Sequence, residues 1–137
     1  MPVLDNLVPI GQLKAEPRNV PELARMLEMA RTRLADAQLS SISQEGRFTS
    51  AYNAAHAAVL AALRWRRYRI ENPYTVLHCL AHIVAWPASR WRVLAAAHQK
   101  RNLAECEGYL KVEESTITEL RALVASVIAD VQALTAH

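Results

Sequence analysis

Apolar residues recur at spacings of three and four along several stretches of the chain, the pattern typical of amphipathic helices. In the first stretch, Asn19 is a suitable N-cap and Pro21 is tolerated in the first turn. The apolar positions that follow are Leu23, Met26, Leu27, Ala30, Leu34 and Ala37. We therefore expect a helix with one buried face over about residues 19–37, followed by a serine-containing loop that ends at Gly46.

A second helix is predicted from about Arg47 to Tyr68. Its expected buried stripe consists of Phe48, Tyr52, Ala55, Val59, Ala62 and Leu63. Asn72-Pro73 stops the helix from continuing. Two shorter helices are then expected, over about residues 74–85 and from about Ser89 to the neighbourhood of Glu105, where Gly108 can serve as a C-cap.

The last helix has a clear sequence signal at its start. Thr116 with Glu119 three residues later matches a capping box. An apolar stripe then continues toward the C-terminus, through Ile117, Leu120, Val124, Val127, Ile128, Val131 and Leu134. Although valine and isoleucine favour strands, the spacing and the length of this segment favour a helix.

These elements predict an all-α protein, a five-helix and mostly antiparallel bundle joined by short connections. Residues 1–18, with prolines at positions 2, 9 and 17, are expected to form an irregular N-terminal arm, and residues 19–137 a single helical-bundle domain. The chain has only three glycines, which argues against an all-β fold, a Rossmann fold and a P-loop. Its two cysteines do not form a disulfide framework, and no segment resembles a signal peptide or a membrane span. We expect a cytoplasmic protein.

Positive charge is concentrated in one region. The net charge of the whole chain is +3, yet residues 64–101 alone carry +7, because Glu71 is their single acid. The basic residues are Arg64, Arg66, Arg67, Arg69, Arg90, Arg92, Lys100 and Arg101. Such a region can attract RNA or an acidic partner. Alternatively, these arginines extend along helix ends and complement a helix dipole.

The most informative stretch is residues 98–109. His98, Arg101, Asn102 and Glu105 are spaced so that they share one face of a helix. An arginine can hold a phosphate, and a histidine can move a proton near neutral pH. The structural alternative is an ion pair between Arg101 and Glu105, with Asn102 completing the helix end. Arg101, Asn102 and His98 are thus the candidate catalytic residues, and Arg64, Arg66, Arg67, Arg69 and Lys100 the candidate binding residues.

The dipeptide Arg101-Asn102, near the end of the penultimate predicted helix and before a long last helix, resembles the signature of the HEPN superfamily. This superfamily consists of small helical bundles that act as toxins, as partners of minimal nucleotidyltransferases or as subunits of RNA-cleaving systems. Active members carry a histidine four to six residues after the arginine and cleave RNA without a metal at a dimer interface. Here Cys106 stands at that place. The resemblance therefore implies a homodimeric, degenerate or non-enzymatic member.

Other residues that could carry chemistry have simpler explanations. His78 and His82 have a spacing that can bind zinc on a helix, but no third ligand is apparent, so no metal is predicted. Acidic neighbours raise the expected pKa of the Cys106 thiol and argue against a nucleophile. Trp65, Trp86 and Trp91 suit base stacking or, as we favour, a protein interface.

The sequence thus predicts a protein that binds RNA, a nucleotide or a partner protein, without a cofactor, in a system of the toxin–antitoxin type. An antitoxin or a nucleotidyltransferase is the expected partner. Two other classes stay open: a metal-independent endoribonuclease toxin that uses Arg101 and His98, and a pure interaction module that docks an acidic protein.

Overall fold

The computed structural model describes residues 13–70, 92–100 and 112–135. In chain order these residues form strand β1 (Leu13–Ala15), helix α2 (Val20–Asp36), helix α3 (Gln44–Trp65), strand β2 (Tyr68–Ile70), a helical segment over 92–100 and helix α6 (Glu114–Thr135). The predicted, mostly helical fold is confirmed. The helix expected over residues 74–85 lies outside the described residues.

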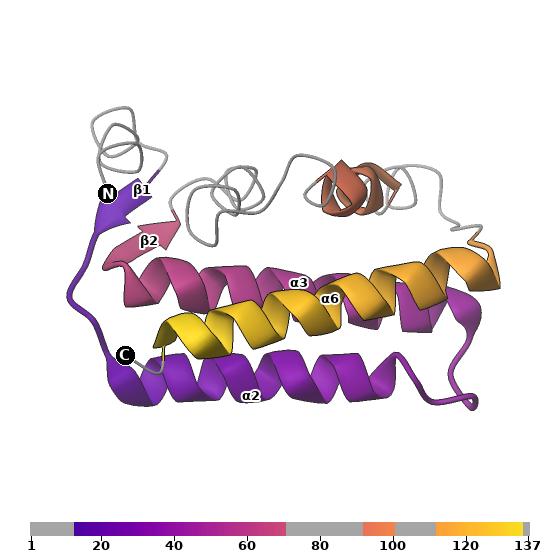
Figure 1. Cartoon of the computed structure of the whole chain (residues 1–137), viewed down its shortest axis with the longest axis horizontal. Coiled ribbons are helices and arrows are strands. Elements are labelled where there is room, and N and C mark those ends of the chain that lie inside the picture. Colours follow the sequence, from indigo (N-terminus) through magenta and orange to yellow (C-terminus); the bar gives the residue numbers. More distant parts are fainter. Residues whose placement is uncertain (1–12, 71–91, 101–111, 136–137) are drawn as a thin grey trace.

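Three long helices form the body of the molecule (Figure 1). α3 packs against both α2 and α6. α2 runs antiparallel to α3, as expected, whereas α6 runs parallel to α3, so that both of these helices begin at the same end of the molecule (Figure 1). An ion pair between Arg47 and Glu114, in the first turns of α3 and α6, joins the two helices at that end.

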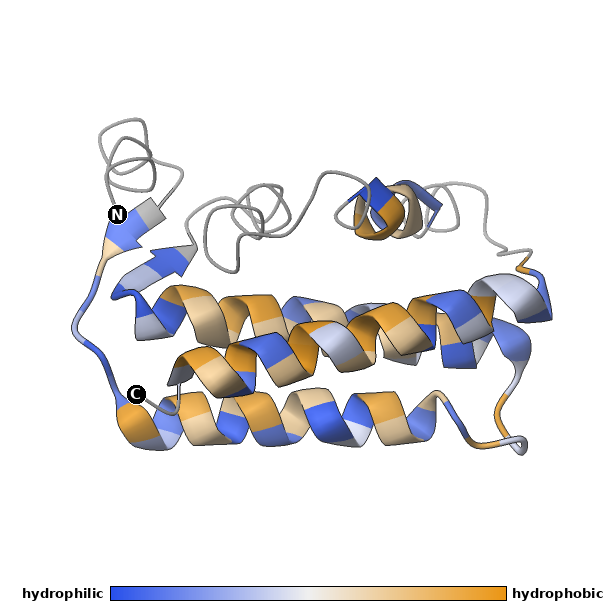
Figure 2. Ribbon diagram, viewed as in Figure 1, coloured by the Kyte–Doolittle hydropathy of each residue, from blue (hydrophilic) through white to orange (hydrophobic). Residues whose placement is uncertain are grey.

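α3 is the central helix because it buries residues all around its axis. Seven of its alanines are buried, and these small side chains let neighbouring helices approach closely. Phe48 and Tyr52 are each only 1% exposed, and Leu94 of segment 92–100 belongs to the same core. In contrast, hydrophilic residues alternate with hydrophobic ones along α2, which borders solvent (Figure 2). Within the described residues, no helix is both long enough and apolar enough to span a membrane.

The hydrogen bonds at the N-terminal ends of the helices can be compared with the predicted caps. Asn19 caps α2 as predicted, accepting a hydrogen bond from the Glu22 N–H at 3.1 Å. The predicted start of α3 was late, because Ser43 accepts a hydrogen bond from the Gly46 N–H and the helix begins at Gln44. The capping box at Thr116 was wrong: the Ile117 N–H already bonds to the Glu113 carbonyl, so Thr116 lies within the first turn of α6.

The prediction of an irregular arm was also wrong in part. Residues 13–15 form β1, which pairs antiparallel with β2 in the register Leu13↔Ile70, Lys14↔Arg69 and Ala15↔Tyr68. The predicted second helix therefore ends early, at Trp65, and its last expected residue belongs to β2. Two strands of three residues are too short to give a recognisable alternation, and their pairing joins distant parts of the chain.

Candidate functional site

The C-terminal end of α3 holds most of the predicted binding residues. Arg64 lies in its last turn, and Arg66 is the C-cap, whose backbone N–H donates to the Ala62 carbonyl at 3.1 Å. Arg67 follows with φ 70°, a left-handed conformation that usually belongs to glycine at this place after a helix. This turn reverses the chain into β2 and leaves the Arg67 side chain exposed.

Arg64 is a buried residue of an ion-pair cluster. Its side chain is 5% exposed, and it pairs with Glu16, which follows β1, and with Glu22 in the first turn of α2, the latter at 2.9 Å. Arg69 of β2 pairs with the same two carboxylates. The cluster therefore joins four separate elements of the chain. The hydrogen bond from Arg69, assisted by the charge of Arg64, holds the pKa of Glu16 below its usual value despite desolvation.

A fifth arginine, Arg18, lies beside this cluster. Its guanidinium carbon is 3.6 Å from the centroid of the Trp65 ring, and its Nε donates to the Trp65 carbonyl at 2.9 Å. Arg18 and Arg67 line an open pocket of about 570 Å³ together with Ala15, Glu16 and Pro17. The Glu16 N–H bonds to the Arg67 carbonyl at 2.9 Å, which holds the two walls of this pocket together.

The five arginines at this end thus have different surroundings. Arg64 and Arg69 share Glu16 and Glu22, so Arg64 does not belong to an exposed basic surface as the sequence had suggested. In contrast, Arg18, Arg66 and Arg67 have no carboxylate partner among the described residues. We call these three residues the basic end of α3.

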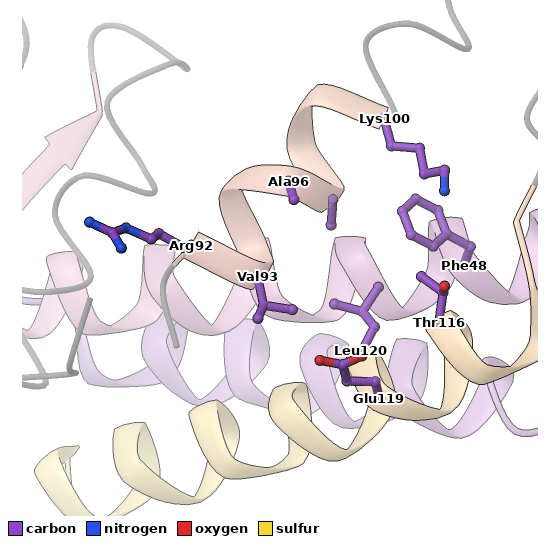
Figure 3. A pocket seen from close by; sticks show the side chains of 9 residues that line it. Phe48, Arg92, Val93, Ala96, Lys100, Thr116, Glu119 and Leu120 are labelled. Atoms are coloured by element: carbon purple, nitrogen blue, oxygen red, sulfur yellow. The ribbon is translucent and has the colours of Figure 1, made fainter. Parts of the chain in front are cut away.

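The predicted residue Lys100 lies elsewhere, on segment 92–100. It lines a pocket of about 420 Å³ between this segment, α3 and α6 (Figure 3). The exposed Arg92 lines the same pocket.

His98, on the same segment, faces the helical core. A hydrogen bond of 2.5 Å joins its Nδ1 to the hydroxyl of Tyr52, and their ring centroids are 5.8 Å apart. Tyr52 also contacts His56, with 6.4 Å between the ring centroids. His98 and Tyr52 therefore tie segment 92–100 to α3. This arrangement gives His98 a structural role that its sequence position did not reveal.

Several candidates lie outside the described residues. They are Arg101, Asn102 and Cys106, the pair His78 and His82, and the tryptophans Trp86 and Trp91. Among the residues that are described, no group of three His, Cys, Asp or Glu side chains is arranged to hold a metal.

Sequence reasoning missed Arg18 and the acids Glu16 and Glu22. The only sequence signal was local: Arg18 directly precedes a predicted N-cap, and Glu22 lies in a predicted first turn, where acids are favourable. Nothing in the spacing connects these residues with arginines more than 40 positions later. Comparison with protein-family models, curated proteins and solved structures finds no match to this chain.

Proposed function

We propose that this chain is a non-enzymatic, HEPN-like helical protein that binds single-stranded RNA through the basic end of α3. The proposal rests on one observation: of the arginines there, some pair with carboxylates and others have no carboxylate partner among the described residues. Glu16 and Glu22 are both engaged by Arg64 and Arg69, so the charges of the remaining arginines are not neutralised within the described part of the chain. Uncompensated positive charge on a rigid helix end attracts a polyanion.

One feature favours RNA over an acidic protein. The planar guanidinium of arginine pairs with phosphate and carboxylate alike, so the three arginines of the basic end of α3 fit either partner. An aromatic ring, that of Trp65, lies among them with Arg18 against it. Aromatic rings and stacked arginines are the groups on which unpaired bases stack. An open pocket between Arg18 and Arg67 gives the phosphate a place to enter.

Binding rather than catalysis is proposed because of His98. This histidine, which the sequence suggested as a catalytic acid or base, forms a hydrogen bond with Tyr52, a residue of the helical core. The resemblance to the HEPN superfamily implies the rest of the proposal. It includes a homodimer with twice the 15.3 kDa chain mass in sedimentation and an antitoxin or nucleotidyltransferase partner. The sequence pattern itself adds a further helix over residues 74–85 to the proposed bundle.

The test compares two double variants that remove the same charge from different surfaces. One is Arg66→Gln with Arg67→Gln, at the basic end of α3. The control is Arg25→Gln with Arg33→Gln, two exposed arginines of α2 that have no ion pair among the described residues. Fluorescence anisotropy with a labelled single-stranded RNA of mixed sequence measures the affinity of each.

We expect the α3 variant to bind RNA about tenfold or more weakly than the wild type, since two charge-assisted contacts are lost. The control should stay within about twofold, because only the net charge of the protein has changed. Equal weakening in both variants would mean that the attraction is not localised at α3. Absence of RNA binding by the wild type, combined with binding of a polyglutamate peptide, would favour an acidic protein partner instead.

A further inference from the structure

A second pocket lies away from the basic end of α3, where segment 92–100 crosses the first turns of α3 and α6 (Figure 3). Its volume of about 420 Å³ falls within the range of sites for small organic ligands. The base of the pocket is apolar. Phe48 and Leu120 are 1% and 2% exposed, so both side chains are fixed by the core around them.

The space in this pocket depends on small residues. Val93 and Ala97 are four residues apart, one helical turn, and both line the pocket. Ala96 also lies at the pocket wall, on the same segment as Val93 (Figure 3). A larger side chain at position 96 would extend into the pocket. Ala96 itself is exposed, so such a change should not disturb the core.

The polar groups of the pocket are unevenly distributed. The ammonium group of Lys100 points toward Phe48 and Thr116, whereas Arg92 points away at the other end of the segment (Figure 3). In the described part of the lining, Glu119 is the single acid, against the two cations Arg92 and Lys100. Among the described residues, Lys100 has no carboxylate partner, and the Thr116 hydroxyl has no hydrogen bond. A cation and a free hydroxyl therefore stand beside a fixed aromatic ring.

We infer that this pocket binds a small organic anion with a flat apolar body. The acidic group of the ligand lies at Lys100 and Thr116, and its body covers Phe48 and Leu120 in the space left by Ala96. The charge of the lining favours an anion, and the apolar base favours a ring system over a bare phosphate or sulfate. This inference does not depend on RNA binding, because the residues of the two sites are different.

The test uses two probes that differ by one charge. 8-Anilinonaphthalene-1-sulfonate combines an aromatic body with a sulfonate, and N-phenyl-1-naphthylamine has the same body without it. Fluorescence titration of the full chain measures the affinity and the number of sites for both probes. Three variants are compared: Lys100→Gln, Ala96→Leu, and the control Lys14→Gln, which neutralises an exposed lysine of β1 outside the pocket.

We expect saturable binding of the sulfonate at one site. Lys100→Gln should weaken the sulfonate about tenfold and leave the neutral probe within about twofold, because the lost contact is to the charged group. Ala96→Leu should weaken both probes, and Lys14→Gln neither. The inference is overturned if the sulfonate does not bind, binds without saturation, or binds Lys100→Gln as tightly as the wild type. Equal loss of both probes in Lys100→Gln, or no effect of Ala96→Leu, would also overturn it.

Discussion

Replacement of Arg64 by methionine tests whether this residue holds the fold together or serves the surface. Methionine keeps most of the apolar length of the side chain but removes its charge, so Glu16 and Glu22 lose their central partner. Removing one member of a buried ion pair costs roughly 3–5 kcal/mol. The side chains of Glu16 and Glu22 are 30% and 22% exposed, so water can hydrate both carboxylates once Arg64 is gone. The expected loss of stability therefore lies near the lower end of that range.

We therefore expect Arg64→Met to lower the free energy of unfolding by about 3 kcal/mol, and Tm by about 10 °C for a chain of this length. Urea denaturation followed by far-UV circular dichroism measures the first quantity, and thermal unfolding the second. Arg67→Gly is the matched variant, because it also removes one arginine from this end. Glycine adopts a left-handed conformation without strain, so this variant should be as stable as the wild type or up to about 1 kcal/mol more stable.

The two variants should also differ in RNA binding. Arg67→Gly should weaken it, whereas Arg64→Met should leave it nearly unchanged under conditions where the protein is folded. A stability of Arg64→Met equal to that of the wild type would refute the structural role of the cluster. Loss of stability in Arg67→Gly would show that its side chain, rather than its backbone conformation, matters for folding.

Three further predictions concern helix ends and the core. Asn19→Ala should destabilise the protein by about 1 kcal/mol in urea denaturation, because α2 loses its capping side chain. Tyr52→Phe should cost about 1–3 kcal/mol, since the hydrogen bond between the Tyr52 hydroxyl and His98 is lost within a half-buried site. Hydrogen bonds from Arg47 and, to a lesser extent, from Gln44 to the Glu114 carboxylate lower its pKa to about 2. Because this folded-state pKa lies below the unfolded value, the contribution of Glu114 is present above about pH 4.5 and is lost as the pH falls toward 2. The stability difference between wild type and Arg47→Met, measured by urea denaturation across this range, should shrink accordingly.

Each of these three predictions has an outcome that would contradict it. An unchanged stability of Asn19→Ala would mean that α2 is held by packing alone. A fully stable Tyr52→Phe would mean that His98 is satisfied by another group. A stability difference for Arg47→Met that stays constant down to pH 2 would show that Glu114 does not contribute through its charge.

The features that the sequence predicted correctly are local. The Asn19 cap and the apolar stripe of α6 depend on neighbouring residues, and the structure confirms both. The surroundings of Arg64 could not be predicted, since its two carboxylate partners lie 48 and 42 residues away. The small sheet was missed for the same reason. The role of His98 depends on Tyr52, 46 residues earlier, and charge counting along the chain does not detect such a pair.

For the candidate binding residues, too, local features could be predicted from the sequence and contacts with distant residues could not. Counting basic residues located the arginines at the C-terminal end of α3 but did not distinguish those that pair with Glu16 and Glu22 from those without a carboxylate partner among the described residues. That distinction required the position of the N-terminal segment, which brings Glu16 to the cluster and Arg18 to Trp65. The pocket beside Lys100 also required the structure, because its lining comes from three helical segments that are distant in sequence.

The salt dependence of RNA binding tests the central proposal most directly. For single-stranded nucleic acid, the slope of log K against log[salt] is about −0.7 for each phosphate contact. The wild type and the two double variants are titrated with the same RNA between about 50 and 200 mM salt. The slope for Arg66→Gln with Arg67→Gln should be smaller in magnitude by about 1.4, while Arg25→Gln with Arg33→Gln should keep the wild-type slope. An identical slope in all three proteins would contradict the assignment of RNA contacts to the basic end of α3.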